Sequence, residues 1–170
     1  MRFQLCIVLA AAALPSLADA QSPVAEAFRH NAADIGRNLV LAAETMPADK
    51  YGFRPTPAQM SFGDIVNHLS QGNDLLCGAI TGMSAPTRDK VAESDGKDAL
   101  VKRLRETFQF CNEMLGHLDD SRLSENLTVF GMTMSRAALE TLTTGDWADH
   151  YSQSAIYLRL NGLLPPTAKK

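Results

Sequence analysis

Apolar residues recur at spacings of three and four along four stretches of the chain, which is the period of an amphipathic helix. The first stretch begins at Ser22, a capping residue, followed by Pro23 at the first helical position. Pro47 ends it. Its apolar stripe consists of Val24, Phe28, Ala32, Ile35, Leu39, Ala42 and Met46. No stretch alternates convincingly between apolar and polar residues, so the pattern predicts no definite strand.

The second helix has clear signals at both ends. Ser61 and Asp64 have the spacing of a capping box, and Gly82 ends the periodic pattern. The stripe between them consists of Phe62, Ile65, Leu69, Leu76 and Ile80. A proline-rich connector over residues 50–57 precedes this helix, and a polar loop over 84–94 follows it.

Two further helices complete the pattern. The third starts near Asp95 and closes at residues 119–121; an irregular link over 125–133 then holds either a turn of helix or a small hairpin. The fourth opens near Ser135 and stops at Gly162. The apolar positions are Leu100 or Val101, Leu104, Phe108, Cys111, Leu115 and Leu118 in the third helix, and Leu139, Leu142, Ile156 and Leu160 in the fourth. Four such helices predict an all-α fold, an antiparallel four-helix bundle whose crossover pattern stays open.

Residues 1–20 have the pattern of a cleaved signal peptide. The positive charge of Arg2 precedes an apolar run, and Ala18 and Ala20 supply the small residues that signal peptidase reads. The run is shorter than the about 20 apolar residues of a spanning helix. We therefore expect bacterial export to the periplasm or the medium, and a mature domain over residues 21–170 with no membrane anchor.

Charge and cysteine content narrow the partners further. The formal net charge is −3 and no basic block is present, so we expect no nucleic-acid partner and leave a small-molecule substrate as the candidate. Cys77 and Cys111 remain after export. Such a pair forms a disulfide in many exported proteins, but two buried cysteines that never meet fit the spacing equally well.

Polar residues interrupt the inward faces of the second and fourth helices. His68 lies on or beside the stripe of the second helix, with Gly72 leaving room next to it. In the fourth helix, Asp146, His150, Gln153 and Tyr157 follow at spacings of four, three and four. Buried polar groups cost free energy unless something satisfies them, so these positions predict a site.

Asp146 and His150, one helical turn apart, have the spacing of paired metal ligands, and His68 from a facing helix supplies a third. Two imidazoles and a carboxylate suit one zinc, nickel or ferrous ion and leave open positions for water or substrate. A plain Asp146–His150 ion pair, a hydrogen-bonded core His68 and a polar network through Gln153 and Tyr157 are the alternatives. The sequence nominates no catalytic residue beyond these groups.

The chain also carries motifs that resemble a known family in order and distance. They are DHYSQ at 149–153, YLRLNG at 157–162, the prolines at 165–166, FRPTP at 53–57, SFG at 61–63, and His68. Together they resemble the DinB/YfiT-like proteins, a superfamily of DinB-like metalloenzymes, over nearly all of residues 21–170. The resemblance implies a four-helix bundle that is often dimeric, so we expect a homodimer.

The resemblance also implies three metal ligands, which fall on His68, Asp146 and His150. The family pattern usually has histidine at the position of Asp146, so the identity of the metal is open. A branch of the family carries paired cysteines at the places of Cys77 and Cys111, which favours the disulfide. The resemblance implies a metal-dependent hydrolase or thiol-dependent transferase of unknown substrate. The alternative is a non-catalytic binding or structural dimer with a degenerate metal site.

Overall fold

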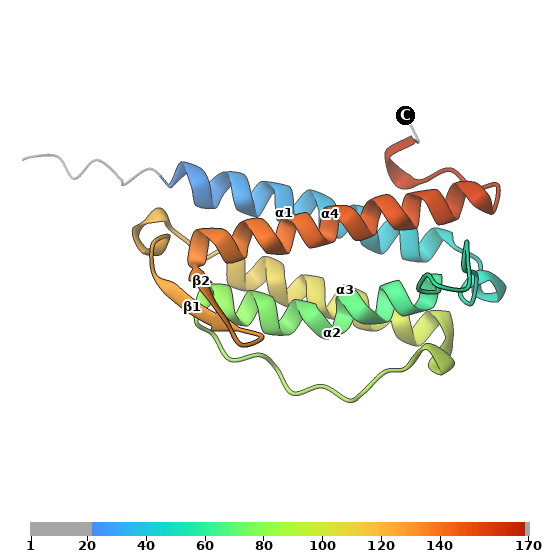
Figure 1. Cartoon of the computed structure of the whole chain (residues 1–170), viewed down its shortest axis with the longest axis horizontal. Helices are drawn as coiled ribbons and strands as arrows, with labels where there is room; N and C mark the ends of the chain where they lie inside the picture. Colours follow the sequence, from blue (N-terminus) through green and yellow to red (C-terminus); the bar gives the residue numbers. More distant parts are fainter. Residues whose placement is uncertain (1–21, 169–170) are drawn as a thin grey trace, which may run out of the picture.

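The computed structural model describes residues 22–168, and the expected signal peptide lies outside them. Four long helices form a bundle: α1 (Pro23–Thr45), α2 (Phe62–Thr81), α3 (Gly96–Leu115) and α4 (Arg136–Leu160) (Figure 1). The predicted four-helix fold class is therefore confirmed. Among the described helices, none has both the length and the apolar composition required to cross a membrane.

The helices follow an up-down-down-up order. Around the bundle, α1 packs beside α3 and α4, while α2 packs beside the same two helices. Lys97 at the start of α3 donates to the backbone carbonyls of Glu44 and Met46 at the end of α1. Asp120, beyond the end of α3, accepts from the backbone N–H groups at the start of α1. The crossover that the sequence left open is the segment between α2 and α3, which runs back along the bundle (Figure 1).

Local capping chemistry sets most helix ends where the sequence placed them. Ser61 and Asp64 form a reciprocal capping box, and Gly82 ends α2 in the left-handed conformation with φ 77°. Gly162, after α4, has φ 72°. The third helix ends earlier than predicted, at Leu115. Beyond it the chain turns into a short 3₁₀ segment, Asp120–Arg122, where the Asp119 carboxylate accepts from the backbone N–H of Ser121.

The link before α4 is a hairpin, which decides between the two structures that the sequence allowed. Strands β1 (Asn126–Val129) and β2 (Met132–Ser135) pair in antiparallel register. Phe130 and Gly131 form the two-residue turn, with φ of 53° and 73°. Positive φ at both turn residues matches the right-handed twist of the strands.

The predicted apolar stripes of α1 and α4 are partly wrong. In α4, Leu142, Ile156 and Leu160 are exposed, and in α1 Val24 is exposed while Ala25 is buried. Leu139 is buried as predicted, and the other buried positions of α4 are Arg136, Glu140, Thr143, Thr144, Trp147, His150, Ser154, Ala155, Tyr157 and Leu158. The threonine hydroxyls bond to carbonyls of their own helix, so they enter the core without external partners.

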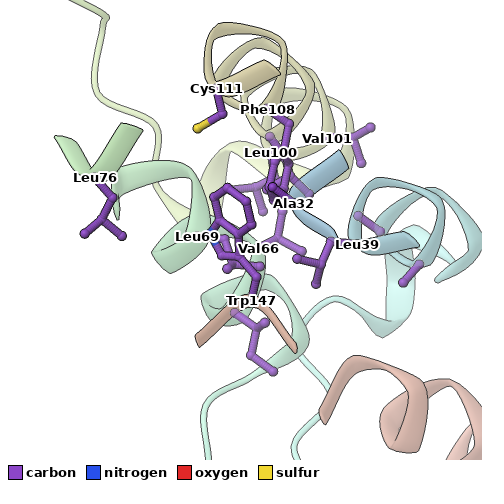
Figure 2. Packing of buried hydrophobic residues seen from close by; sticks show 14 of the residues in the cluster. Ala32, Leu39, Val66, Leu69, Leu76, Leu100, Val101, Phe108, Cys111 and Trp147 are labelled. Atoms are coloured by element: carbon purple, nitrogen blue, oxygen red, sulfur yellow. The ribbon is translucent and has the colours of Figure 1, made fainter. Parts of the chain in front are cut away.

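The core around Trp147 fixes α4 in place (Figure 2). Its ring packs edge-on against Phe108 of α3 with centroids 5.0 Å apart. Its indole N–H donates to Asn73 Oδ1 of α2 at 2.9 Å, and Asn73 Nδ2 donates to Thr107 Oγ1 of α3 at 3.2 Å. One buried amide therefore links three helices, and it satisfies the indole N–H that burial would otherwise penalise.

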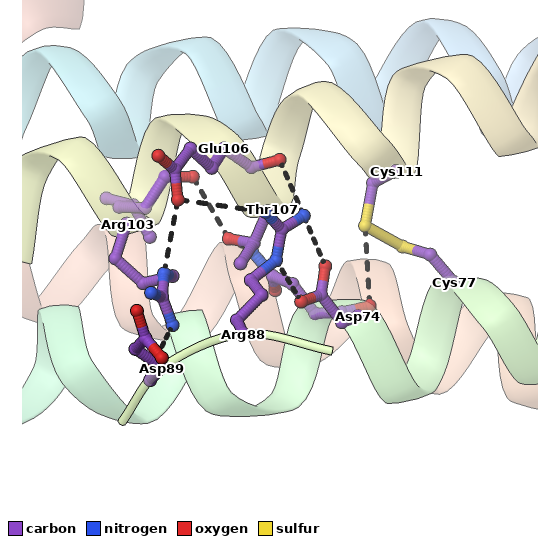
Figure 3. A network of polar contacts seen from close by, with 10 residues as sticks. Asp74, Cys77, Arg88, Asp89, Arg103, Glu106, Thr107 and Cys111 are labelled. Carbon is purple, nitrogen blue, oxygen red and sulfur yellow. Dashed lines mark hydrogen bonds and ion pairs between the residues drawn. A yellow bond between two sulfur atoms is a disulfide. The ribbon is translucent and has the colours of Figure 1, made fainter. Parts of the chain in front are cut away.

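Two cross-links hold the crossover segment and the α2–α3 pair (Figure 3). A disulfide joins Cys77 of α2 to Cys111 of α3, with Cα atoms 5.2 Å apart. To the left of the disulfide in Figure 3, the guanidinium of Arg88 from the crossover segment donates to both carboxylate oxygens of Asp74 on α2, at 2.5 and 3.2 Å. The same side chain also lies 3.7 Å from the carboxylate of Glu106 on α3. The segment is therefore tied to both helices that it connects.

Two charged side chains of α4 lie in the interior away from His68 and His150. Arg136 is 1% exposed and donates to Glu125 at 2.5 Å. Glu140 is 3% exposed, and its Oε1 has no hydrogen-bond partner among the described residues. Burial raises the pKa of Glu140, an effect that Arg136 opposes and Asp120 reinforces. The charged carboxylate therefore costs stability at neutral pH.

Removing the disulfide should lower stability without changing the fold. The bond closes a separation of 34 residues, for which loss of loop-closure entropy predicts about 2–4 kcal/mol. Urea unfolding should show this loss for the Cys77→Ala/Cys111→Ala double variant. Dithiothreitol should lower the stability of the wild type by the same amount and leave the variant unchanged. Equal wild-type stability with and without reductant would contradict this expectation.

Glu140→Gln should raise the free energy of unfolding at pH 7 by about 1 kcal/mol, because an amide removes the desolvated charge. The folded-state pKa of Glu140 is raised above its ordinary value of 4.5, so protonation favours the folded state. The advantage of the variant should shrink as pH falls through the raised pKa and vanish below 4.5. Chemical unfolding between pH 4 and 8, beside Glu113→Gln at an exposed position, measures it. A loss of stability at pH 7 that disappears on acidification would show instead that the carboxylate pairs favourably with Arg136.

Candidate metal centre

His68 of α2 and Asp146 and His150 of α4 lie together where these two helices face each other. One nitrogen or oxygen atom from each side chain lies within 4.8 Å of the other two. His150 Nε2 is 3.5 Å from Asp146 Oδ1, and the imidazole rings of His68 and His150 have centroids 4.9 Å apart. The structure thus brings together all three residues that the sequence nominated as metal ligands.

The three side chains differ in depth. The His150 side chain is 10% exposed and forms the floor of the three-residue ligand group, whereas the Asp146 side chain is 38% exposed. His68 is exposed, although the sequence placed it on the inward face. It lies three residues after Ile65 and one before Leu69, both buried, so its own position turns toward the rim of the bundle. The group therefore opens to solvent on the side of His68.

The contact between Asp146 and His150 shifts the pKa values of both side chains. The hydrogen bond from His150 lowers the pKa of Asp146, although burial opposes that shift. The same bond raises the pKa of His150, again against the effect of burial. The Asp146 carboxylate therefore favours the charged form of its neighbour, as it would favour a bound cation.

A second aspartate–histidine pair, on the surface of α1, shows that this spacing does not by itself indicate a metal site. His30 and Asp34 of α1 are also one turn apart, with His30 Nε2 3.4 Å from Asp34 Oδ2, and the His30 side chain is 81% exposed. Asp34 also pairs with Arg37 at 2.9 Å, so an aspartate and a histidine at this spacing are an ordinary surface contact when no second histidine joins them. The pair on α4 differs in its burial and in the third group, His68, from another helix.

The donor set fits a divalent cation. Two imidazoles and one carboxylate are ligands that zinc, nickel and ferrous iron share, and three protein ligands leave positions open for other groups. His150 Nδ1 is buried without a hydrogen-bond partner among residues 22–168. In metal sites the second ring nitrogen usually donates to an oxygen, which holds the ring and leaves the first nitrogen free to bind. The side chain of Gln153 lies near His150, and hydrogen bonding to it also raises the pKa of the His150 imidazole.

The other nominated residues have separate roles. Gln153 Nε2 donates to Asp149 Oδ2 at 2.6 Å, so Asp149 points along the helix surface and not toward the three ligands. Tyr157 is buried, packs against Phe53 and donates to the Met60 carbonyl at 2.9 Å. Tyr157 therefore anchors the segment before α2, and the structure gives it no contact with the ligand group.

A small pocket adjoins the ligand group, and the sequence nominated few of its lining residues. Its volume is about 130 Å³, and it is lined by His68, Leu69, Gly72, Asn73, Leu76, Phe130, Leu142 and Asp146. The prediction that Gly72 leaves room beside His68 agrees with this pocket. Asn73, Phe130 and Leu142 were missed because Asn73 looked like an ordinary polar residue, Leu142 like core, and Phe130 like part of a loop.

Comparison with known proteins agrees with this architecture. A sequence profile described as the DinB superfamily matches residues 32–154. A DinB-like protein from Bacillus subtilis has a TM-score of 0.65 at 19% identity, over 80% of this chain and 92% of that one. A DinB-like protein from Bacillus cereus has a TM-score of 0.68 at 14% identity, over 83% and 95%. No curated protein matches this chain.

The solved structures, at these identities, show the shared fold, and the profile match extends over most of the 170 residues. The predicted family is therefore confirmed: the chain belongs to the DinB superfamily.

Proposed function

We propose that this protein is an exported, divalent-metal-dependent enzyme, a hydrolase or a thiol-dependent transferase. The observation that carries the proposal is the convergence of His68, Asp146 and His150 to within 4.8 Å at a group open on one side. A structural metal site would surround its ion with four protein ligands. A three-ligand group beside a pocket fits a site that also receives a substrate.

The chain's own residues would hold the ion and orient the substrate. A bound divalent cation would supply Lewis-acid chemistry to a carbonyl or thiol group placed beside it. His150, packed into the bundle, fixes one ligand, and Asp146 offsets part of the positive charge. His68 supplies the third ligand from α2. Because His68 is exposed, a substrate could reach the ligand group from the rim of the bundle. The apolar wall of the pocket excludes water from one side of the group.

A non-catalytic module with a degenerate metal site is the second candidate, and two observations favour it. Asp146 stands where the family usually has histidine, and the carboxylate of Asp149, the nearest further acid on α4, is bonded to Gln153. No separate general base is therefore aimed at the ligand group among these residues. In this candidate the fold persists as a binding or structural dimer.

Export and dimerisation belong to the proposal as well. Export rests on the signal-peptide pattern of residues 1–20 and fits the disulfide, which oxidising compartments favour. Homodimerisation rests on the family resemblance.

The mature protein should contain about one divalent ion per chain after native purification, by elemental analysis. His68→Ala and Asp146→Ala should lose it, because two remaining ligands hold an ion weakly. At 100 times the dissociation constant, the metal should also raise the free energy of unfolding of the wild type by about 2.7 kcal/mol. This stabilisation should be absent in both variants.

His30→Ala is the matched control, since it removes a histidine from an aspartate–histidine pair of the same spacing. It should leave the metal content unchanged. A wild type that holds no metal after purification and cannot be reconstituted would reject the enzyme proposal. Metal retained by His68→Ala would place the ion elsewhere.

Asp146→His should keep the site and change its preference. Imidazole suits zinc and nickel, whereas carboxylate oxygen suits manganese and magnesium, so the ratio of zinc to manganese affinity should rise about tenfold. Asp146 is partly exposed, which leaves space for the larger ring. Competitive titration with a metallochromic dye measures the ratio. An unchanged ratio would mean that residue 146 is not a ligand.

A further inference from the structure

The pocket beside the ligand group is lined mainly by apolar side chains. Leu69 and Leu76 from α2, Leu142 from α4 and Phe130 from the hairpin turn form these walls. Asn73, one of the polar lining residues, already bonds to Trp147 and Thr107 through its amide. Apart from His68 and Asp146, the pocket thus offers little to a polar guest and favours an apolar one.

Gly72 keeps this pocket open without being required by packing. A Cβ atom at Gly72 would meet only Leu76 Cδ1, at 3.8 Å, which is ordinary van der Waals contact. By contrast, a Cβ at Gly36 of α1 would lie 2.8 Å from Phe108. A glycine inside a helix costs about 1 kcal/mol relative to alanine. At position 72 this cost leaves pocket space that an alanine would reduce.

Phe130 breaks a local rule of hairpin turns. The first residue of a turn with positive φ at both positions is usually asparagine, aspartate or glycine, because other side chains are strained there. Phe130 has φ 53° and is 64% exposed, so its ring does not fill the core. Strained residues persist where the surrounding structure holds them, and they cluster at functional sites. Here the strain places an aromatic ring at the wall of the pocket.

We propose that this pocket binds an apolar group of the substrate, up to the size of a phenyl ring, while the polar part of the substrate lies at His68 and Asp146. Phe130 is then a specificity-determining residue, and the hairpin turn supplies one wall of the binding site. This inference rests on the proposed function for the polar part of the substrate. The apolar part depends only on the pocket.

The volume sets the size of the guest. An apolar cavity of about 150 Å³ accommodates one benzene molecule. The pocket measures about 130 Å³, so its volume suits a phenyl ring or a branched aliphatic group of similar bulk. The substrate class is therefore a small molecule with one metal-binding polar group and one compact apolar group.

Two hydroxamic acids test the proposal on zinc-loaded protein. Both have the same metal-binding group, but acetohydroxamic acid has a methyl group where benzohydroxamic acid has a phenyl ring. Isothermal titration calorimetry should show benzohydroxamic acid binding at least tenfold more tightly to the wild type. Equal affinities would overturn the proposal.

Two variants separate a binding role from a structural one. Phe130→Asn introduces the residue that the turn prefers, so thermal stability should stay equal or rise while the preference for benzohydroxamic acid falls below threefold. Gly72→Ala should stabilise the helix and weaken benzohydroxamic acid about threefold. Leu160→Ala, at an exposed leucine of α4 outside the pocket, should change neither affinity. Retention of the full preference by Phe130→Asn, or its loss together with stability, would overturn the role of Phe130.

A metal-free experiment distinguishes failure of the pocket from failure of the metal site. The chain has one tryptophan, Trp147, and its N–H bonds to Asn73 in the pocket wall. Toluene added to metal-free protein should shift the indole N–H resonance of the wild type, and the shift should saturate more weakly in Gly72→Ala. If zinc fails to bind but this shift occurs, the pocket stands and the metal proposal falls. If zinc binds and toluene produces no shift, the apolar pocket is rejected.

Discussion

The rotation of α4 against α2 depends on the hydrogen bond between Trp147 and Asn73. The indole of Trp147 is 1% exposed, and its buried N–H requires a partner. Asn73 satisfies it at 2.9 Å while donating its own amide to Thr107 of α3. Because Trp147 directly follows Asp146 and precedes His150 by three residues, burying the indole also sets the directions of both side chains. His150 then lies at the floor, Asp146 at the edge, and His68 faces them from α2.

This arrangement explains why a polar face of α4 can lie inside a bundle. Threonine hydroxyls return to their own helix, Tyr157 reaches the Met60 carbonyl, and Arg136 pairs with Glu125. Among residues 22–168, the exceptions on α4 are Glu140 Oε1, two guanidinium nitrogens of Arg136 and, next to the ligand group, His150 Nδ1. Its position matches the second ring nitrogen of a metal-binding histidine, which usually requires an oxygen partner. On the α2–α3 side, the disulfide and the Arg88 contacts add cross-links to the hydrophobic core.

Most helix ends were predictable because they depend on residues close in sequence. The Ser61–Asp64 box and the glycines at 82 and 162 act within one turn. The inward face of α4 was not predictable from hydrophobicity, since Leu142 and Ile156 are exposed while Thr143 and His150 are buried. That face is set by Trp147 and by groups on other helices. The course of the crossover segment likewise depends on Arg88 meeting Asp74 and Glu106, which are far apart in sequence.

The candidate site likewise has one part that was predictable from the sequence and one that was not. The spacing of Asp146 and His150 is a property of one helix, so it was visible in the sequence. The pocket was not, because Phe130 reaches it only through a strained hairpin turn and Leu142 has the pattern of a core residue. His68 was nominated by its position on a facing helix and again by the family resemblance, and the fold places it beside Asp146 and His150.

The most direct test of the account is anomalous X-ray diffraction from crystals of the natively purified protein, measured on both sides of the absorption edge of the bound metal. The account predicts one anomalous peak per chain, about 2.0–2.2 Å from a nitrogen of His68, a nitrogen of His150 and an oxygen of Asp146. A peak bound to other residues, or no peak beside an intact Asp146–His150 contact, would contradict it.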